Sequence, residues 1–417
     1  MTRLRYLVSP SDARRGSGAD GGELLSVSIH RGVVPRSSET DDLPRADDLA
    51  NYKVVRAGDV VLNRMRAFQG AVGRSAHDGV VSPDYTVLRP GPDVDSRYLN
   101  HLFRSGWFVG EMVARLRGIG STDTGSVRTP RINWEDLGDI DVTAPPMAEQ
   151  RAIADFLDAE TARIDALIAK KQQLIRLLEE WVGAVVLRGV SGQLTSAGAP
   201  TRDSGLDWLG PIPEHYGTPT IGANFSTQLG KMLNAVAAAG PEQFPYIKNT
   251  NVKWDEFDLS SLPTMSFPAE DRVRCELRAG DLLVCEGGEV GRSAVWPGSD
   301  ESIYFQKALH RVRPLANANT RFLMYCLWAA ADLDVFSVEG NQATIVHLTG
   351  EKLREHRFPW PPAEEQSEIV RLIDADRTRV EALVSQLAHQ SDLLAEHRQA
   401  VITAAVTGAT RCAEVKA

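Results

Sequence analysis

The sequence predicts two α/β modules in tandem, each followed by one long helix. Pro-Pro-Met-Ala-Glu-Gln at 145–150 returns 216 residues later as Pro-Pro-Ala-Glu-Glu-Gln at 361–366, and each copy opens a long helical pattern. The segments before the two helices also share short motifs in the same order. A period of half the chain is too long for a solenoid, so it indicates two copies of one module.

The first module is predicted over residues 1–144. Its apolar runs at 54–62 and 80–88 are broken by turn residues, which is typical of strands. A helix is predicted around 96–113 and a closing strand over 136–142.

The first long helix is predicted within 145–194. Apolar residues recur every seven positions over about four heptads, so residues 148–187 would form a rod of roughly 60 Å. We expect its stripe to contain Leu157, Ile164, Leu167, Leu174, Leu178 and Trp181, with Ile168, Ile175 and Val182 beside them.

The second module is predicted over 195–360, after a linker at 196–204. Ala-Gly-Asp-Leu-Leu-Val at 279–284 repeats Ala-Gly-Asp-Val-Val-Leu at 57–62, and Val-Gly-Arg-Ser-Ala occurs at both 72–76 and 290–294. The residues between these repeats differ, which fits related scaffolds whose loops bind different things.

The second long helix and a tail are predicted over 361–417. Because both helices carry heptads, we expect them to pack on each other as an antiparallel coiled coil. The alternative is two unrelated amphipathic helices, each packed on its own module. Lys171, Gln390 and His397 interrupt the stripes, either to set the register or to face a partner. The second stripe is expected to contain Ile373, Val380, Leu383, Leu387, Leu394 and Val401.

The composition is that of a globular protein. The longest apolar stretches, such as 181–187, are far shorter than the ~20 residues that span a bilayer, and residues 1–6 have no apolar signal core. We therefore expect a cytoplasmic protein. The cysteines form no close pair, which favours thiols in a reducing compartment over a disulfide or a zinc site: Cys275, Cys285, Cys326 and Cys412.

The charge of the chain is unfavourable for nucleic-acid binding as a whole. The net charge is −9, and no segment is net basic: residues 1–144 carry 0, 145–194 carry −1, 195–360 carry −5 and 361–417 carry −3. Any DNA-binding surface must therefore be a local patch, and a partner could supply much of the affinity for phosphate.

Several catalytic motifs are missing from the sequence. The Pro-Pro pairs at 145–146 and 361–362 lack the preceding Asn or Asp and the following aromatic residue that an amino-methyltransferase needs to hold its target amine. The sequence has no Walker-type phosphate loop, no Gly-x-Ser-x-Gly elbow and no closely spaced His/Cys cluster. These absences argue against a self-sufficient enzyme.

The order of module, Pro-Pro-x-x-Glu-Gln helix, module and second such helix resembles the specificity subunit of type I restriction–modification systems. The first helix from Gln150 to Ile168 and the entry Trp-Leu-Gly-Pro-Ile-Pro-Glu-His-Tyr at 208–216 are close to the family pattern. The resemblance covers nearly the whole chain. It departs from the family in the first module, which lacks the Trp-Leu-Gly entry.

The resemblance implies a subunit without catalytic activity of its own. Two target-recognition domains would each read one half of a split site in double-stranded DNA, and the paired helices would act as a spacer. Two methyltransferase subunits and two motor–nuclease (restriction) subunits would bind this protein. No cofactor is expected in this chain, and S-adenosylmethionine, ATP and Mg would belong only to the partner subunits.

Candidate DNA-contacting residues are chosen by side-chain type on the predicted loops. Arg, Lys, Asn and Gln read base edges, and Arg and Lys also neutralise phosphate. For any single residue, a solvated surface side chain is at least as good an interpretation. The candidates are Arg64, Arg66, Gln69, Arg74 and Arg131 in the first module, and Lys248, Asn249, Asn251, Arg292, Gln306, Lys307, Asn341 and Gln342 in the second.

Two other functions stay open at this point. A stand-alone DNA-modifying enzyme would transfer a methyl group without partners. A coiled-coil scaffold protein without a DNA role would show no competition between specific and random duplexes, even with a methyltransferase present.

Overall fold

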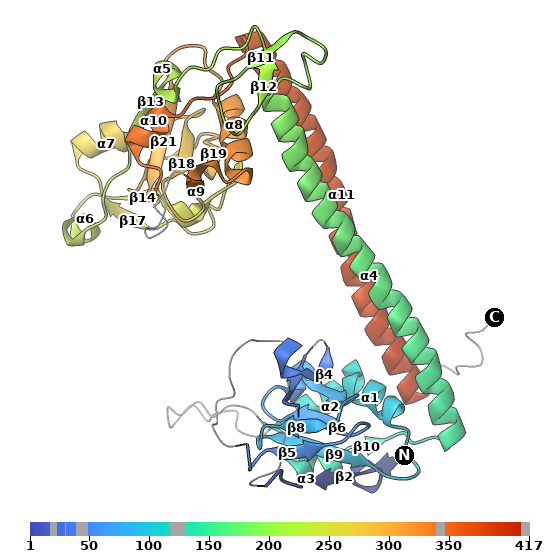
Figure 1. Ribbon diagram of the computed structural model, residues 1–417. Coiled ribbons are helices and arrows are strands. Elements are labelled where there is room, and N and C mark those ends of the chain that lie inside the picture. Colours follow the sequence, from blue (N-terminus) through green and yellow to red (C-terminus); the bar gives the residue numbers. More distant parts are fainter. Residues whose placement is uncertain (17–22, 30, 39–48, 117–130, 339–346, 410–417) are drawn as a thin grey trace. The chain divides into compact units, whose positions relative to one another are not determined.

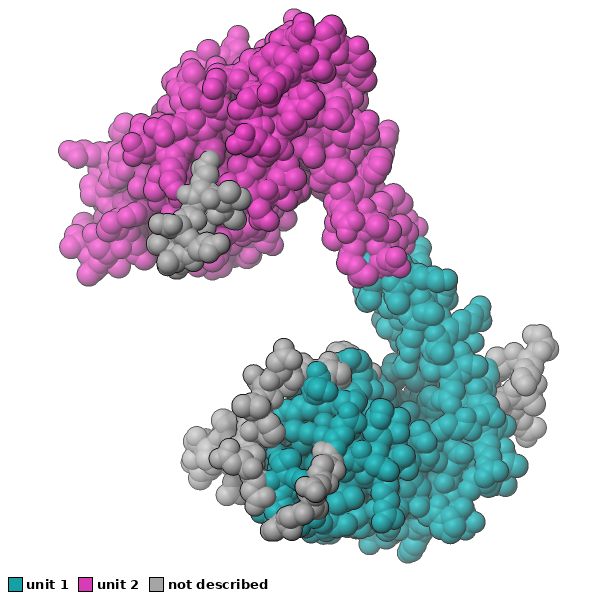
Figure 2. Space-filling view, viewed as in Figure 1, with its two compact units in different colours: residues 1–172, 388–417 teal, residues 173–387 magenta. Residues whose placement is uncertain are grey.

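The computed structural model describes residues 1–16, 23–29, 31–38, 49–116, 131–338 and 347–409 (Figure 1). The chain forms two compact units (Figure 2). Unit 1 contains residues 1–172 and 388–417, and unit 2 contains residues 173–387. Each unit therefore combines one module with segments of both long helices.

A four-stranded antiparallel sheet forms the centre of unit 1. Its strand order is β2-β9-β6-β7, and helices α1 and α2 follow β9 along the chain. The elements of the module are β1 (Thr2–Arg3), η1 (Leu4–Tyr6), β2 (Val8–Ser11), β3 (Leu25–Ser28), β4 (Gly32–Pro35), η2 (Arg36–Ser38), β5 (Lys53–Val55), β6 (Val60–Asn63), η3 (Ala67–Gln69), β7 (Val72–Arg74), β8 (Gly79–Val81), β9 (Tyr85–Pro90), α1 (Ser96–Arg104), α2 (Gly106–Val113), α3 (Trp134–Gly138) and β10 (Asp141–Val142).

Unit 2 repeats this sheet. Its strand order β13-β21-β18-β19 matches that of unit 1, and α8 follows β21 as α1 follows β9. A second, three-stranded sheet has the order β17-β14-β20. The elements are β11 (Thr201–Asp203), β12 (Pro211–Pro213), α5 (Ile221–Asn224), β13 (Phe225–Leu229), α6 (Ala235–Ala239), β14 (Gln243–Ile247), η4 (Asn249–Asn251), β15 (Val252–Lys253), β16 (Glu256–Phe257), β17 (Thr264–Ser266), α7 (Ala269–Cys275), β18 (Leu282–Cys285), β19 (Ser293–Val295), β20 (Tyr304–Phe305), β21 (Leu309–Pro314), α8 (Thr320–Asp332), α9 (Val335–Val338) and α10 (Gly350–Glu355).

The repeated Ala-Gly-Asp motif forms the same turn in both units. Asp59 and Asp281 are 3% and 1% exposed, and each accepts a hydrogen bond from a backbone N–H three residues earlier. Each also binds an arginine of the neighbouring strand, Arg89 or Arg313. A buried carboxylate needs such partners, which explains why the aspartate recurs with its arginine.

The two long helices are α4 (Met147–Val190) and α11 (Ala363–Thr407). Both begin directly after the Pro-Pro pair, where proline stops an earlier helix. Gln150 and Gln366 are both 2% exposed, and each donates a hydrogen bond to the carbonyl oxygen of the first proline of its pair. The repeated glutamine therefore fixes the backbone at the entry to each helix.

Each module buries the start of one long helix and the end of the other. In unit 1 the core includes Leu157 of α4 and Ile402 of α11, and in unit 2 it includes Val186 of α4 and Ile373 of α11. The mixed α/β content and the long helices predicted from the sequence are thus present in both units.

Within unit 1, α4 and α11 touch through Asp165–Arg398 (2.9 Å) and Lys171–Gln390 (2.5 Å). Not every expected stripe residue is buried. Leu157, Ile164, Ile373 and Val380 are at most 8% exposed, and Leu178, Leu387, Leu394 and Val401 are half-buried. Leu167, Leu174, Trp181 and Leu383 are 40–52% exposed and do not lie in a buried seam.

Some expected stripe residues of α4 are exposed because the buried stripe follows a different heptad register. Ile168, Ile175 and Val182, one residue further along the helix, are half-buried instead. A stripe through 164, 168, 171 and 175 also steps by four and three residues, so both registers fit the heptad equally well.

Three local predictions also differ from the structure. The helix expected over 96–113 is divided at Ser105, which is extended and whose side chain caps α2. The strand expected over 136–142 is helical α3 up to Gly138, because Glu135 and Asp136 favour a first helical turn, and only β10 is a strand. The linker expected at 196–204 contains β11.

Candidate nucleic-acid interface

The loop after β6 carries the first candidate base-reading side chains. Arg64 is half-buried, and its Nη2 donates to Asn133 Oδ1 at 2.7 Å. Arg66 and Gln69 are exposed, with Arg66 Nε donating to Gln69 Oε1 at 3.1 Å. Arg64 therefore holds the loop against Asn133, whereas Arg66 and Gln69 lie on the surface.

Arg131 and Arg74 have different positions. Arg131 is exposed and precedes Ile132, whose backbone N–H donates to the Arg64 carbonyl, so it lies beside this loop. Arg74 is half-buried, and its Nε donates to Ser96 Oγ at 2.8 Å. Arg74 thus ties β7 to α1 and is not grouped with the other candidates.

In unit 2, Asn249 and Arg292 come together. Arg292 Nη2 donates to Asn249 Oδ1 at 2.7 Å, and Asn249 Nδ2 donates to the Gly287 carbonyl at 2.8 Å. Arg292 Nη1 also donates to Glu289 Oε2 at 2.9 Å. The pair is therefore held in place before any ligand arrives, with Glu289 as a third polar member that the sequence analysis did not select.

The other candidates of unit 2 differ in exposure. Asn251 is 5% exposed and donates to the Asp258 carbonyl, so its role is structural. Lys248 and Gln306 are half-buried, and Lys307 is exposed. Asn341 and Gln342 lie outside the described residues.

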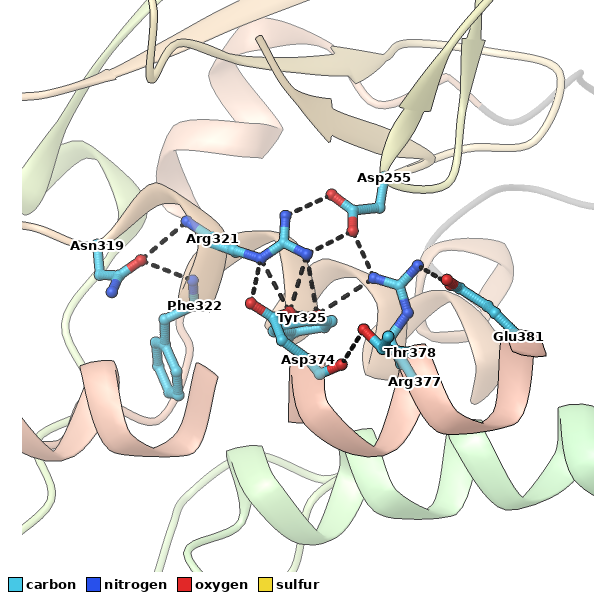
Figure 3. Close-up of polar contacts among 9 residues, drawn as sticks. All are labelled: Asp255, Asn319, Arg321, Phe322, Tyr325, Asp374, Arg377, Thr378 and Glu381. Carbon is cyan, nitrogen blue, oxygen red and sulfur yellow. Dashed lines mark hydrogen bonds and ion pairs between the residues drawn. The ribbon is translucent and has the colours of Figure 1, made fainter. Parts of the chain in front are cut away.

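A network of charges joins the second module to helix α11 (Figure 3). Arg321 of α8 donates to both Asp374 of α11 and Asp255 of the β15–β16 turn, at 2.7–2.9 Å. Arg377 of α11 also donates to Asp255, and Tyr325 donates to Asp374. Burial opposes the charge on Arg321, but its carboxylate partners outweigh this and raise its pKa.

Unit 1 has a simpler version of this network. Arg97 of α1 binds Asp158 of α4 at 3.2 Å and Asp155 at 2.7 Å, and His101 binds Asp158 at 2.7 Å. Burial lowers the pKa of His101 although Asp158 acts in the opposite direction. The sequence contained the signal for both networks, because Arg97 recurs as Arg321 and Asp158 recurs as Asp374.

Glu365 was also missed as a structural centre. Its carboxylate accepts hydrogen bonds from Thr195, Ser196 and Tyr216 at 2.7–2.9 Å and pairs with His215 at 2.8 Å. Burial opposes ionisation, but these donors lower its pKa to about 2. The carboxylate therefore fastens the Trp-Leu-Gly entry of the second module to the first turn of α11.

The described residues contain no group of three or more His, Cys, Asp or Glu side chains arranged to hold a metal ion. In the same part of the chain, no helix is both long and apolar enough to cross a membrane.

Known proteins share both the sequence pattern and the fold. Residues 226–381 match the sequence profile of the type I restriction modification DNA specificity domain. The chain is 24% identical to the type I restriction enzyme EcoBI specificity subunit of Escherichia coli over 61% of its own length and 55% of that protein. It is 22% identical to the EcoKI specificity subunit of Escherichia coli strain K12 over 76% and 67% of the two chains. The chain is therefore similar to type I specificity subunits in the sequence of residues 226–381 and over most of its length.

Two solved structures share the fold of this chain. A chain from work on complex assembly and conformational transition of the type I R-M system has a TM-score of 0.67 and 18% identity, over 98% of this chain and 97% of that one. The HsdS subunit from Thermoanaerobacter tengcongensis has a TM-score of 0.52 and 19% identity, over 98% and 96%. The chain spans about half the length of the EcoBI relative.

Proposed function

We propose that this subunit reads a split DNA site for a type I restriction–modification complex and has no catalytic activity of its own. The observation that carries the proposal is the duplication of one α/β module with the same sheet order, one copy of which matches the DNA specificity domain. Each module would read one half-site by hydrogen bonds in the major groove.

The two long helices would pair as an antiparallel coiled coil that separates the half-sites. Two contacts in unit 1 and one in unit 2 support this pairing. Asp165 meets Arg398 and Lys171 meets Gln390 in unit 1, while Gly189 of α4 faces Ile373 of α11 in unit 2. In all three pairs the residue numbers rise on one helix as they fall on the other, as an antiparallel pair requires.

The base contacts are proposed at the exposed candidates and at the half-buried Asn249–Arg292 pair. Arg66, Gln69 and Arg131 would serve the first half-site, and Lys307 with the Asn249–Arg292 pair the second. Arg64, Arg74 and Asn251 bind the protein itself and would support these loops. The acidic charge of the second module makes a local reading surface more plausible physically than broad attraction to phosphate.

The partners would be two methyltransferase subunits and two restriction subunits, acting on DNA in the cytoplasm. S-adenosylmethionine, ATP and Mg would be bound by those partners. The partner subunits would therefore carry out the reactions, and this chain would select the DNA sequence.

Co-expression with the methyltransferase subunit of its own system, followed by methylation mapping of the host genome, tests the proposal. We expect adenine methylation at one split motif, lost when this chain is omitted. Methyl transfer by this chain alone would instead support a stand-alone enzyme. A complex that does not form, or equal binding of specific and random duplexes, would support a scaffold.

A further inference from the structure

A short hairpin of unit 2 lies between the base-reading candidates and helix α11. Strands β15 and β16 pair antiparallel and are joined by Trp254 and Asp255. Asp255 has a φ of 56°, a left-handed conformation that Asp tolerates better than most residues. A turn of this kind persists when the surrounding contacts hold it.

On one side of the turn, Asp255 fastens the hairpin to the helix. Its side chain is 9% exposed and lies between Arg321 and Arg377 (Figure 3). Arg377 belongs to α11 and is itself 13% exposed. A largely buried carboxylate shared by two arginines, one largely buried and one partly buried, is costly to remove, because both guanidinium groups would lose a charged partner.

On the other side, Trp254 reaches the base-reading candidates. Its Nε1 donates to Glu289 Oε1 at 2.5 Å, and Glu289 binds Arg292, which in turn binds Asn249. The Trp254 ring also stacks on Trp328, with ring centroids 5.2 Å apart. Arg377 lies over the same Trp328 ring at 5.0 Å. A continuous set of contacts therefore joins Asn249 to helix α11.

The corresponding attachment in unit 1 is more exposed. Arg97 binds Asp155 and Asp158, whose side chains are 67% and 45% exposed. Exposed ion pairs of this kind contribute little to stability. The second module is thus held on its long helix by a less solvated set of contacts than the first.

We propose that Trp254 and Asp255 are positioning residues that set how strictly the subunit discriminates the spacer length of its DNA site. This inference rests on the proposed function. The two residues hold Asn249 and Arg292 at a fixed position relative to α11. They therefore act on the distance between half-sites and not on the identity of the bases.

The geometry of DNA gives the physical reason. One added base pair moves a half-site by about 3.4 Å along the duplex and turns it by roughly 35°. A firmly mounted module cannot follow this movement, so its hydrogen bonds to the bases are lost. A module that is held less rigidly on α11 follows this movement in part. The methylation rate on duplexes with a wrong spacer then rises relative to the rate on duplexes with the correct spacer.

The test compares D255N and W254F in the complete complex with the methyltransferase subunit. Methylation rates are measured on duplexes with the native spacer and with spacers one base pair shorter and longer. We expect D255N to lower the native-to-altered ratio about tenfold, and W254F, which removes one donor and keeps the stack, to lower it less. D376N changes an aspartate of α11 whose side chain is 39% exposed and which pairs with Arg379, so it should keep the wild-type ratio.

Changes to the half-site bases should reduce methylation equally in all four proteins. A D255N complex that melts at the wild-type temperature and keeps the wild-type spacer ratio overturns the inference. If D255N does not fold, W254F decides: an unchanged ratio overturns the inference, and a lowered one supports it. A wild-type complex without preference for any split site would contradict the proposed function itself.

Discussion

At the scale of single residues, the repeated Glu-Gln pair has two different roles. The glutamines are buried and bind proline carbonyls in both units, whereas Glu365 binds four side chains around the entry of the second module. In the sequence, Glu365 is recognisable only as an acidic residue near the start of a predicted helix, where a negative charge is favourable. It could not predict the four partners, because they come from a segment about 150 to 170 residues away.

The lowered pKa of Glu365 predicts a pH-dependent stability. Its folded-state value is about 2 against an ordinary value of 4.5. The stabilisation is therefore fully present above about pH 4.5 and is lost as the pH falls toward 2. We expect E365Q to lower the free energy of unfolding by about 2 kcal/mol at pH 7, measured by urea unfolding. The difference should shrink at pH 3, and E364Q, at an exposed neighbour, should behave as wild type.

The exposed candidates predict half-site-specific effects. We expect R66A to cost about 1–3 kcal/mol in binding at its half-site and to relax the base preference there. K307A should act on the other half-site only. Binding of the complex to a set of duplexes with single base changes measures both effects. R371A, at an exposed arginine of α11 paired with Glu368, serves as the control. Equal loss at both half-sites would refute the assignment.

At the scale of elements, the sequence predicted the repeated modules and both long helices because repetition and heptad spacing extend over many residues. On α4 it predicted the covered positions Leu157, Ile164 and Leu178, but it placed the other part of the stripe one residue before the half-buried Ile168, Ile175 and Val182. Ile168 and Leu167 are both apolar, and only packing decides which of the two is covered. The break at Ser105 and the helix α3 likewise depend on local capping and charge within a few residues.

The burial pattern of α4 predicts that truncating Ile164 and truncating Leu167 destabilise the protein to different extents. Ile164 is 2% exposed and Leu167 is 40% exposed. We expect I164A to lower the free energy of unfolding by about 2–4 kcal/mol and L167A by less than about 1 kcal/mol. Thermal unfolding of the two variants side by side measures the difference. Equal losses would show that Leu167 belongs to the buried stripe after all.

At the scale of the whole molecule, duplication places one module and segments of both helices in each unit. The base-reading residues could be proposed only by type, since base contacts depend on a ligand whose sequence the chain does not encode. In the proposed function, the separation of the half-sites would instead follow from the length of the two helices. Helices of 44 and 45 residues have nearly equal lengths, as a paired spacer requires.

Helix length therefore predicts the spacer length of the DNA site. Deleting residues 168–174 and 387–393 removes one heptad from each helix, or about 10.5 Å of rise. B-DNA rises about 3.4 Å per base pair, so the preferred spacer should shorten by about three base pairs with both half-sites unchanged. Three base pairs also turn the half-sites by roughly 100°, which one heptad of a coiled coil does not reproduce. Methylation mapping should therefore find the motif with the shorter spacer, methylated less efficiently than the original motif. Altered half-sites at the original spacing would show that helix length does not set the spacer.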